Sequence, residues 1–380
     1  MVTPHRPTLR SLAAEAGVSA TTVSFALRNS AEISRATCER LQRLAAARGY
    51  RANPLVSALL SQVRRRKPRG DHAVIAYLNT WWPKRLWESC DTKSGQFRGA
   101  AERAGALGFH LENFWLNEPG MTPSRLAKIL QTRGIRGVLV GPLQHQTVPI
   151  DFPWADFALA TMGYSLHTPA ISRACHAHFR GMHRAMDELI AHGYRRIGYV
   201  TSSDFEGRVN SLWGAAYRLK QHDLDASNRI EPLVFESEAG RDGLRRWVRE
   251  TRPDAIINAL PDVFEMLGEL GVRTPDDAGF VHLDLPVHLK DACICGIDQL
   301  WDIVGAGALE LVASQLYTNS CGVRAHPVTQ LVEGVWLAGR TLVDTPHASN
   351  PGAVRRGGTS ASDRHLGRNR LRGQRVNSKL

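Results

Sequence analysis

The chain has 380 residues, a formal net charge of +12 and 43% hydrophobic residues. This length exceeds one typical domain, so we expect a small head and a large body. The first thirty residues contain no apolar signal-peptide core, and no run of about 18 apolar residues occurs, so we expect a cytoplasmic protein that does not enter the membrane.

The positive charge is concentrated at the two ends of the chain. Residues 1–70 hold 13 Lys and Arg against 3 Asp and Glu, and residues 346–380 hold 8 against 1, which leaves the middle at −5. Basic charge gathered at one end is typical of a segment that contacts nucleic-acid phosphates.

The first helical elements are predicted within residues 9–29. Apolar side chains occur at helical spacing, at Leu9, Leu12, Ala13 and Ala16. Gly17 can adopt positive φ, and Ser19 is a good cap for a second helix. The inner face of that helix is formed by Val23, Ala26 and Leu27, which leaves Ala20, Thr21 and Phe25 outside near its start. These residues predict a helix-turn-helix whose second helix is free to enter the major groove.

A third helix and a linker follow. Ser34 is expected to cap a helix over 34–48 that ends at Gly49. The solvent-exposed face of this helix is formed by Arg35, Arg40, Arg43 and Arg48. In the linker 51–71, Asn53 and Pro54 can start a short hinge helix, which is too short to be stable alone in water. We expect this hinge helix to fold only on DNA, where it pairs with the same helix of a second copy of the chain.

The run GVSATTVSFALRN, followed by SRATCERLQRLAAARGYRANPLVSALL, resembles the N-terminal module of the LacI/GalR family of bacterial transcription regulators. The resemblance implies that Leu59 inserts into the minor groove. It also implies that Asn53, at the start of the hinge helix, contacts DNA. It also implies phosphate contacts from Ser19, Thr22, Ser24, Arg28, Ser34 and Thr37. Arg28 stands where an asparagine is usual.

The reading face departs from the family pattern. Ala20 and Phe25 can touch thymine methyl groups, and Thr21 can hydrogen-bond either type of base. The alternative is that Phe25 packs into the head and reads no base.

From Ala73 onward, strands and helices alternate, which predicts parallel sheets with helices on both faces. The expected fold class is α/β, with an all-α helix-turn-helix head (1–50) and a body (72–345) of two Rossmann-like lobes. The resemblance extends to about residue 345 and implies a sensor of the periplasmic-binding-protein type. Three crossings would place 72–180 and 300–328 in the first lobe, and 181–299 and 329–345 in the second.

The end of the chain, 346–380, is rich in Gly, Ser, Asn and Arg and predicts a disordered basic tail. It lacks the leucine heptads that would form a tetramer, so we expect a homodimer.

Ligands of open α/β sheets bind beyond the carboxyl ends of the strands, here between the lobes. The residues at those strand ends are Asn79, Trp81, Gly141, Tyr164, Ser202, Asp204, Asn258 and Asp284. Arg208, Asn210 and Trp213 lie at the start of the helix after strand 195–202, where an N-terminus favours a polar or anionic ligand. The resemblance implies that Asp284 accepts hydrogen bonds from effector hydroxyls. The predicted effector residues are therefore Asn79, Trp81, Arg208, Asn210, Trp213, Asn258 and Asp284.

Three polar anchors of the family are replaced. Trp213 replaces the arginine that binds the effector in the family. Ala177–His178 replaces an Asp-Asn pair, and Leu260–Pro261 replaces an Asn-Asp pair. A sugar could still stack on Trp213 or Trp81. A monosaccharide bound by several charged side chains is therefore a weaker expectation here than in typical members of the family.

No metal or cofactor site is expected. The cysteines have neither disulfide-framework nor zinc spacing, and are Cys38, Cys90, Cys175, Cys293, Cys295 and Cys321. Cys293 and Cys295 alternate along an expected strand. The histidines at 176, 178 and 183 lack a matching cysteine or carboxylate cluster.

The expected function is that of a dimeric repressor, which reads a pseudo-palindromic DNA operator and responds to a small metabolite, for example a carbohydrate. The alternatives are an α/β enzyme and a solute-binding protein, each with an accessory helical head. We expect no enzyme, because VGAGAL (304–309) lacks a third glycine and no P-loop or Gly-x-Ser-x-Gly elbow is present. A solute-binding protein would lack residues 9–60 and carry a signal peptide.

Overall fold

The structure is a computed structural model that describes residues 8–27, 32–48, 50, 73–143, 150–236 and 240–345. The predictions for Arg28, Asn53, Leu59, the hinge 51–71 and the tail 346–380 lie outside these residues. No helix in the described ranges has the length and apolar character needed to cross a membrane.

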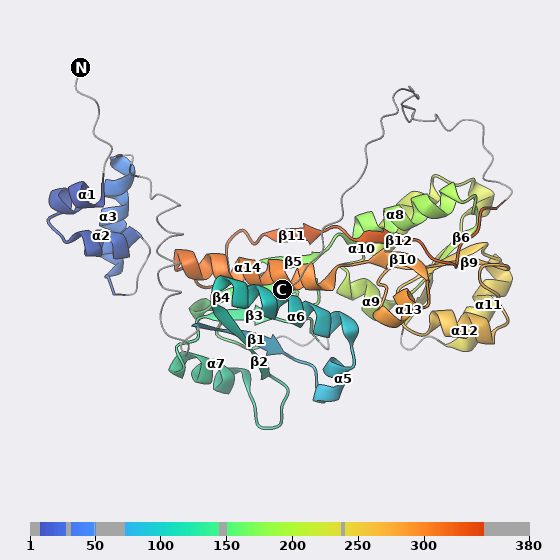
Figure 1. Cartoon of the computed structure of the whole chain (residues 1–380), viewed down its shortest axis with the longest axis horizontal. Helices are drawn as coiled ribbons and strands as arrows, with labels where there is room; N and C mark the ends of the chain where they lie inside the picture. The colour runs from blue at the N-terminus through green and yellow to red at the C-terminus, as the bar shows by residue number, and fades with distance from the viewer. Residues whose placement is uncertain are drawn as a thin grey trace, which may run out of the picture. The chain divides into compact units, whose positions relative to one another are not determined.

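The head is a bundle of three helices, α1 (Leu9–Ala16), α2 (Ala20–Leu27) and α3 (Arg35–Ala47) (Figure 1). Leu12, Val23 and Leu41, one from each helix, lie in its core. Helix α1 ends at Gly17, which has the left-handed φ of +67° that the turn requires. The predicted helix-turn-helix and third helix are confirmed.

The first lobe is built on a six-stranded parallel sheet. Its strands, in order across the sheet, are β11 (Thr329–Val332), β5 (Arg173–His176), β4 (Ala158–Met162), β3 (Gly137–Val140), β1 (Ala73–Asn79) and β2 (Phe109–Trp115). One face is covered by α6 (Asp91–Leu107) and α14 (Trp301–Thr318), and the other by α7 (Pro123–Thr132). The short α5 (Lys84–Glu88) precedes α6.

Glycines bring α6 and α14 together. A Cβ atom on Gly305 would lie 1.9 Å from the backbone oxygen of Gln96, and one on Gly99 would lie 2.0 Å from that of Asp302. The small residues of VGAGAL therefore serve helix packing, and Figure 1 shows the two helices running alongside each other.

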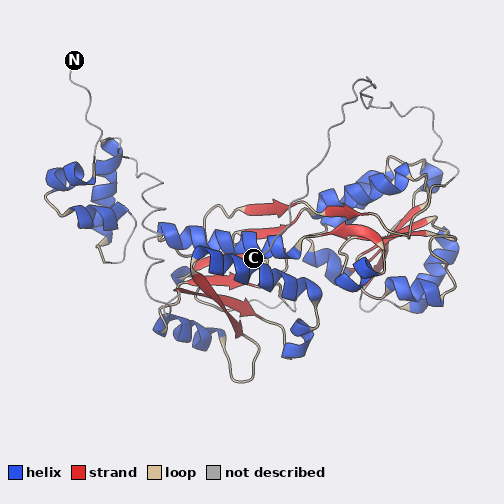
Figure 2. Cartoon of the chain, viewed as in Figure 1, coloured by secondary structure: helices blue, strands red, loops and turns tan. Residues whose placement is uncertain are grey.

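The second lobe has the same plan. Its strands, in order, are β12 (Val335–Leu337), β10 (Cys295–Asp298), β9 (Gly279–His282), β8 (Ala255–Asn258), β6 (Ile197–Ser202) and β7 (Leu233–Phe235), and only β12 is antiparallel to its neighbour. Helices α8 (His178–Ala191) and α10 (Leu212–Gln221) pack on one face (Figure 2). The other face carries α11 (Arg241–Thr251), α12 (Val263–Glu269) and α13 (Val287–Asp291).

The chain passes between the two sheets three times, at 177, at 299–300 and at 333–334. The third crossing lies later than we expected, because β11 pairs with β5 and Val332 packs in the core of the first lobe. The first lies slightly earlier, because α8 already begins at His178. Cys293 is also not in a strand, since β10 begins at Cys295 and Cys293 occupies a turn with φ of +57°.

Candidate DNA-reading face and effector site

The start of α2 combines a helix cap with exposed hydroxyl groups. The Thr22 amide donates to Ser19 Oγ at 3.0 Å, and the two hydroxyl oxygens lie 2.8 Å apart. Thr21 is exposed, whereas Ala20 and Phe25 are half-buried. Ala20 packs partly against the core of the head, so its contact with a base would use only part of its side chain.

The start of α3 repeats this arrangement. The Thr37 amide donates to Ser34 Oγ at 3.3 Å, and the Ser34 and Thr37 hydroxyl oxygens lie 2.8 Å apart. Helix N-termini attract anions because their first amide groups have no partner within the helix and the helix dipole places a partial positive charge there. The head thus presents two capped N-termini that can each receive a phosphate.

Cross-helix contacts fix the position of α2. Gln42 Nε2 of α3 donates to the Ala26 carbonyl at 2.9 Å, which satisfies a carbonyl in the last turn of α2. Arg48 Nε donates to Glu15 Oε1 at 2.9 Å and joins the end of α3 to α1. Because α2 is bonded to α3 through Gln42 and packs in the core of the head through Val23 and Ala26, its outer residues keep a defined direction.

In the body, three predicted effector residues carry buried polar atoms that remain unsatisfied. Asn79, Trp213 and Asn258 are 1%, 2% and 0% exposed. Asn79 Nδ2, Trp213 Nε1 and Asn258 Oδ1 have no hydrogen-bond partner among the described residues. Such atoms are rare in folded proteins and call for a ligand or water.

Trp81 lies beside two cations. Its Nε1 donates to the Pro142 carbonyl at 2.7 Å, and its backbone amide donates to Asn79 Oδ1 at 3.0 Å. Lys93 Nζ is 3.7 Å from the ring centroid and the Arg208 guanidinium carbon is 5.6 Å from it. A sugar could stack on Trp81 only where these groups leave its ring uncovered.

Two hydrogen bonds join the lobes here. Arg208 Nη2 of the second lobe donates to the Leu143 carbonyl of the first at 2.9 Å. The Val287 amide donates to Asp91 Oδ2 at 3.3 Å. The lobes therefore touch at the strand ends, where the effector was predicted.

Asp284 takes part in a third inter-lobe contact. Trp301 Nε1, at the start of α14, donates to Asp284 Oδ1 at 2.6 Å. Burial raises the pKa of the Asp284 carboxyl to about 6, although the Trp301 hydrogen bond and the charges of Lys93 and Lys290 act in the opposite direction. One carboxylate oxygen is thus already engaged.

His178, which stands for the asparagine of the Asp-Asn pair, belongs to a cluster of histidine and tryptophan rings. The ring centroid of His178 lies 5.2 Å from that of His176 and 5.1 Å from that of Trp213. Burial lowers the pKa of His176 to about 4 and that of His178 well below its usual value, so both rings are neutral at pH 7. These two rings therefore supply no charged group at pH 7.

A small cavity of about 270 Å³ lies near this cluster. Its lining comes from both lobes and consists of Tyr164, His167, Ile171, Arg173, Asn210, Pro327 and Thr329. The Tyr164 ring centroid is 6.0 Å from that of His178, and the Arg173 guanidinium carbon is 5.2 Å from the Tyr164 ring. Of the predicted effector residues, Asn210 lines this cavity, with a left-handed φ of 54°.

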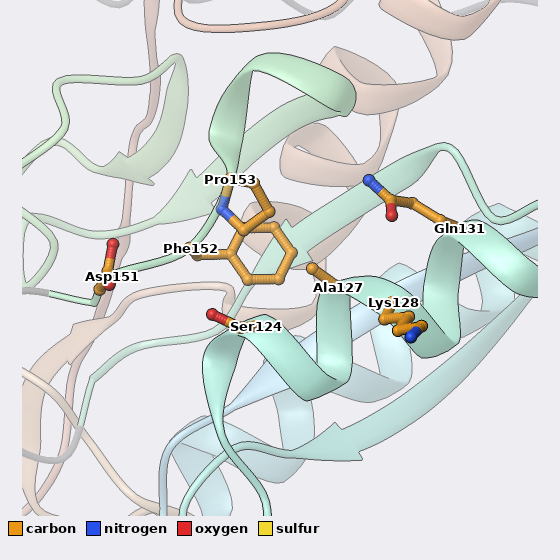
Figure 3. A pocket seen from close by; sticks show the side chains of 7 residues that line it. All are labelled: Ser124, Ala127, Lys128, Gln131, Asp151, Phe152 and Pro153. Atoms are coloured by element: carbon orange, nitrogen blue, oxygen red, sulfur yellow. The ribbon is translucent and has the colours of Figure 1, made fainter.

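A larger hollow of about 480 Å³ lies on the first lobe, away from these residues. It is bounded by α7 and the segment before Trp154, through Ser124, Ala127, Lys128, Gln131, Asp151, Phe152 and Pro153. Figure 3 shows the Phe152 ring directed toward α7 between Ser124 and Ala127. None of the predicted effector residues contributes to its lining.

The sequence reasoning did not select Lys93, Arg173, His178 or Trp301, which the structure places beside predicted effector or strand-end residues. Lys93 and Trp301 lie in the first turns of α6 and α14, and no local sequence pattern marks these turns as neighbours of the strand ends. In the described ranges, no group of three His, Cys, Asp or Glu side chains is placed to hold a metal ion.

Comparisons agree with this architecture. Residues 8–53 match the family model for bacterial regulatory proteins, lacI family, and no curated protein matches the chain by sequence. The transcriptional regulator CelR–cellobiose complex is 22% identical, with a TM-score of 0.55 over 88% of this chain and 100% of that chain. The lac repressor dimer bound to operator and the anti-inducer ONPF is 18% identical, with a TM-score of 0.55 over 89% and 99%.

A third solved structure, the LacI family regulator CcpA from Weissella paramesenteroides with bound glucose, is 14% identical, with a TM-score of 0.53 over 71% and 98%. At these identities the likeness shows the fold. The predicted fold class, a helix-turn-helix head and a two-lobed α/β body, is confirmed.

Proposed function

We propose that this chain, whose residues 8–53 match the family model for bacterial regulatory proteins, lacI family, is a member of that family and a dimeric transcriptional repressor controlled by a small metabolite. The observation that carries the DNA-binding part is the pair of hydroxyl-capped helix N-termini in the head. Ser19 with Thr22 and Ser34 with Thr37 supply donors for backbone phosphates, while exposed Thr21 lies at the start of α2 for base contact. Ser24 and Phe25 lie about one turn further along α2. Ser24 would contact a phosphate, and Phe25 would contact a base.

The sensor part is supported by the unsatisfied atoms of Asn79, Trp213 and Asn258 at the ends of strands or at the start of α10. Solved regulators of this fold hold cellobiose or glucose, and one is bound to operator DNA. We assign the corresponding roles here to the inter-lobe residues and to the head. The site residues would be those predicted, with Lys93 and His178 added.

Coupling between the two parts follows from differential affinity. An effector that binds one arrangement of the lobes better than the other shifts the population toward it, and by no more than that difference in binding free energy. The inter-lobe contacts of Arg208, Asp284 and Asp91 are the ones that such a shift must break or strengthen.

An enzymatic role has less support. Buried titrating groups such as His176, His178 and Asp284 can mark an active site. However, the two histidines are neutral and packed against rings, and Asp284 is bonded to a tryptophan. We therefore propose a cytoplasmic, non-enzymatic regulator.

Selection of duplexes from a random DNA library by the full-length protein tests this function. We expect a two-fold symmetric motif with half-site centres roughly 10 bp apart, because a symmetric dimer reads successive major grooves. The selected duplex should lose affinity for a Thr21→Ala variant without a change in melting temperature. Recovery of no motif, or of one without symmetry, would contradict the proposal.

A further inference from the structure

Several basic side chains lie against aromatic rings near the strand ends, and Lys93, Arg208 and Arg173 are among them. Lys93 and Arg208 lie over Trp81, and Arg173 lies over Tyr164. Lys93 comes from the first lobe and Arg208 from the second, so the Trp81 indole is a point where cations of both lobes meet. A cation on a ring is stabilised, but it keeps donors available for a ligand.

These cations differ in how closely a carboxylate approaches them. Lys93 has no carboxylate within 4 Å in the described part of the chain; its ammonium donates to Cys90 Sγ at 2.8 Å, and its charge lowers the pKa of the more distant Asp284 carboxyl. Arg208 pairs with Asp204, whose side chain is 59% exposed, so water weakens that pair. Lys290, by contrast, is 2.7 Å from Asp298, and both side chains are less than 30% exposed.

The uncharged polar groups also favour donation. Asn79 Nδ2 and Trp213 Nε1 are both donors, both are at least 98% buried, and neither has a partner among the described residues. On the acceptor side, Asp284 Oδ1 is already bonded to Trp301, and the His178 ring is neutral. Asn258 Oδ1 and His178 Nδ1 remain without a partner among the described residues, and both are uncharged.

A neutral sugar needs acceptors for its hydroxyl protons, whereas a carboxylate or a phosphate presents only acceptors at neutral pH. The surplus of donors therefore matches an anion. We propose that the effector is an anionic metabolite whose carboxylate or phosphate group is bound by Lys93 and Arg208 beside Trp81; this rests on the proposed sensor function. Because the two cations belong to different lobes, one bound anion would hold both lobes together.

Thermal-shift and calorimetric titration of the full-length protein tests this assignment. The probes are glucose, glucuronate, glucose 6-phosphate and inorganic phosphate, at constant ionic strength. We expect at least one acidic probe to raise the melting temperature while glucose does not, and the two sugar derivatives then distinguish a carboxylate from a phosphate. An equal shift with glucose, or no shift with any acidic probe, overturns the assignment.

Matched variants locate the effect. Lys93→Met should weaken binding of the acidic probe at least tenfold, and Lys93→Arg should restore most of it. Lys84→Met is the control, because Lys84 lies on the same lobe and pairs with Glu118 at 3.5 Å. Equal affinity in Lys93→Met and in the wild type overturns the role of Lys93, and melting without probe shows whether each variant is folded.

DNA binding is measured on the same samples. If wild type and Lys93→Met bind the selected duplex equally but no acidic probe binds, the effector class is wrong and the regulator function stands. If the wild type binds no duplex at all, the proposed function itself fails. Release of the duplex by the acidic probe in wild type, but not in Lys93→Met, supports both.

Discussion

At the scale of single residues, Ser34 combines two roles that substitution can separate. Its Oγ accepts the Thr37 amide and caps α3, and the same exposed hydroxyl is proposed to contact phosphate. Ser34→Ala should cost about 1 kcal/mol in unfolding free energy of the head and also weaken DNA binding.

Ser34→Asp is the informative partner. Aspartate caps a helix as well as serine does, so stability should return, but its charge repels phosphate and DNA affinity should fall further. Urea unfolding and duplex titration at fixed salt measure the two effects. Recovery of DNA binding together with stability in Ser34→Asp would remove Ser34 from the phosphate contacts.

Trp213 offers a second test at this scale. Its side chain is 2% exposed and its Nε1 has no partner among the described residues, so the ring contributes packing but no internal hydrogen bond. Trp213→Ala should cost about 3–5 kcal/mol and Trp213→Phe only about 1 kcal/mol, the latter for the lost ring volume. Denaturant unfolding measures both variants. If Trp213→Ala and Trp213→Phe lose equal unfolding free energy, the indole N–H has a hydrogen-bond partner in the free protein.

The residues of the site were only partly predictable. Asn79 and Asp284 could be placed because parallel strands bring their carboxyl ends to one edge of a sheet. Lys93 and Trp301 could not, since their positions depend on how helices from distant parts of the chain approach those ends. No local pattern encodes that Trp301 would donate to Asp284 across the lobes.

At the scale of elements, the contact between α6 and α14 depends on glycine. Gly305→Ala places a Cβ against the Gln96 backbone oxygen, which cannot yield as a flexible side chain would. We expect a loss of about 3 kcal/mol or more in unfolding free energy.

Gly105→Ala is the matched control within α6, because a Cβ there meets nothing within 4 Å. It should stabilise the lobe by up to about 1 kcal/mol through helix propensity. Both variants are compared by chemical denaturation of the full chain. A Gly305→Ala protein as stable as Gly105→Ala would show that the helices can separate at no cost.

The same glycines show where pattern reading reaches its limit. VGAGAL could be read as half of a nucleotide-binding loop or as part of a helix, and the missing third glycine, preceding strand and acidic partner favoured the helix. Hydrophobic alternation located most strands, but β11 was assigned to the wrong lobe. Periodicity reports that a strand is half-buried and does not report which sheet it joins.

At the scale of the whole molecule, stability should fall steeply as the solution is acidified. Burial lowers the pKa of His176 and of His282 to about 4 and lowers that of His178 too, whereas unfolded histidine titrates near 6.5. Between pH 6.5 and 4 the unfolded chain therefore binds more protons, and each such histidine removes up to about 1.4 kcal/mol per pH unit.

Asp284 acts in the opposite direction. Because its pKa is raised to about 6, the folded chain retains a proton that the unfolded chain releases above pH 4, so this contribution is lost as the pH rises through 6. One carboxyl opposes three histidines, and we expect the melting temperature to fall from pH 7 to pH 4.5. His282→Gln should make this fall shallower, and His222→Gln, an exposed control in the same lobe, should not. A melting temperature that rises on acidification would mean that Asp284, with its contacts between the lobes, dominates the linkage.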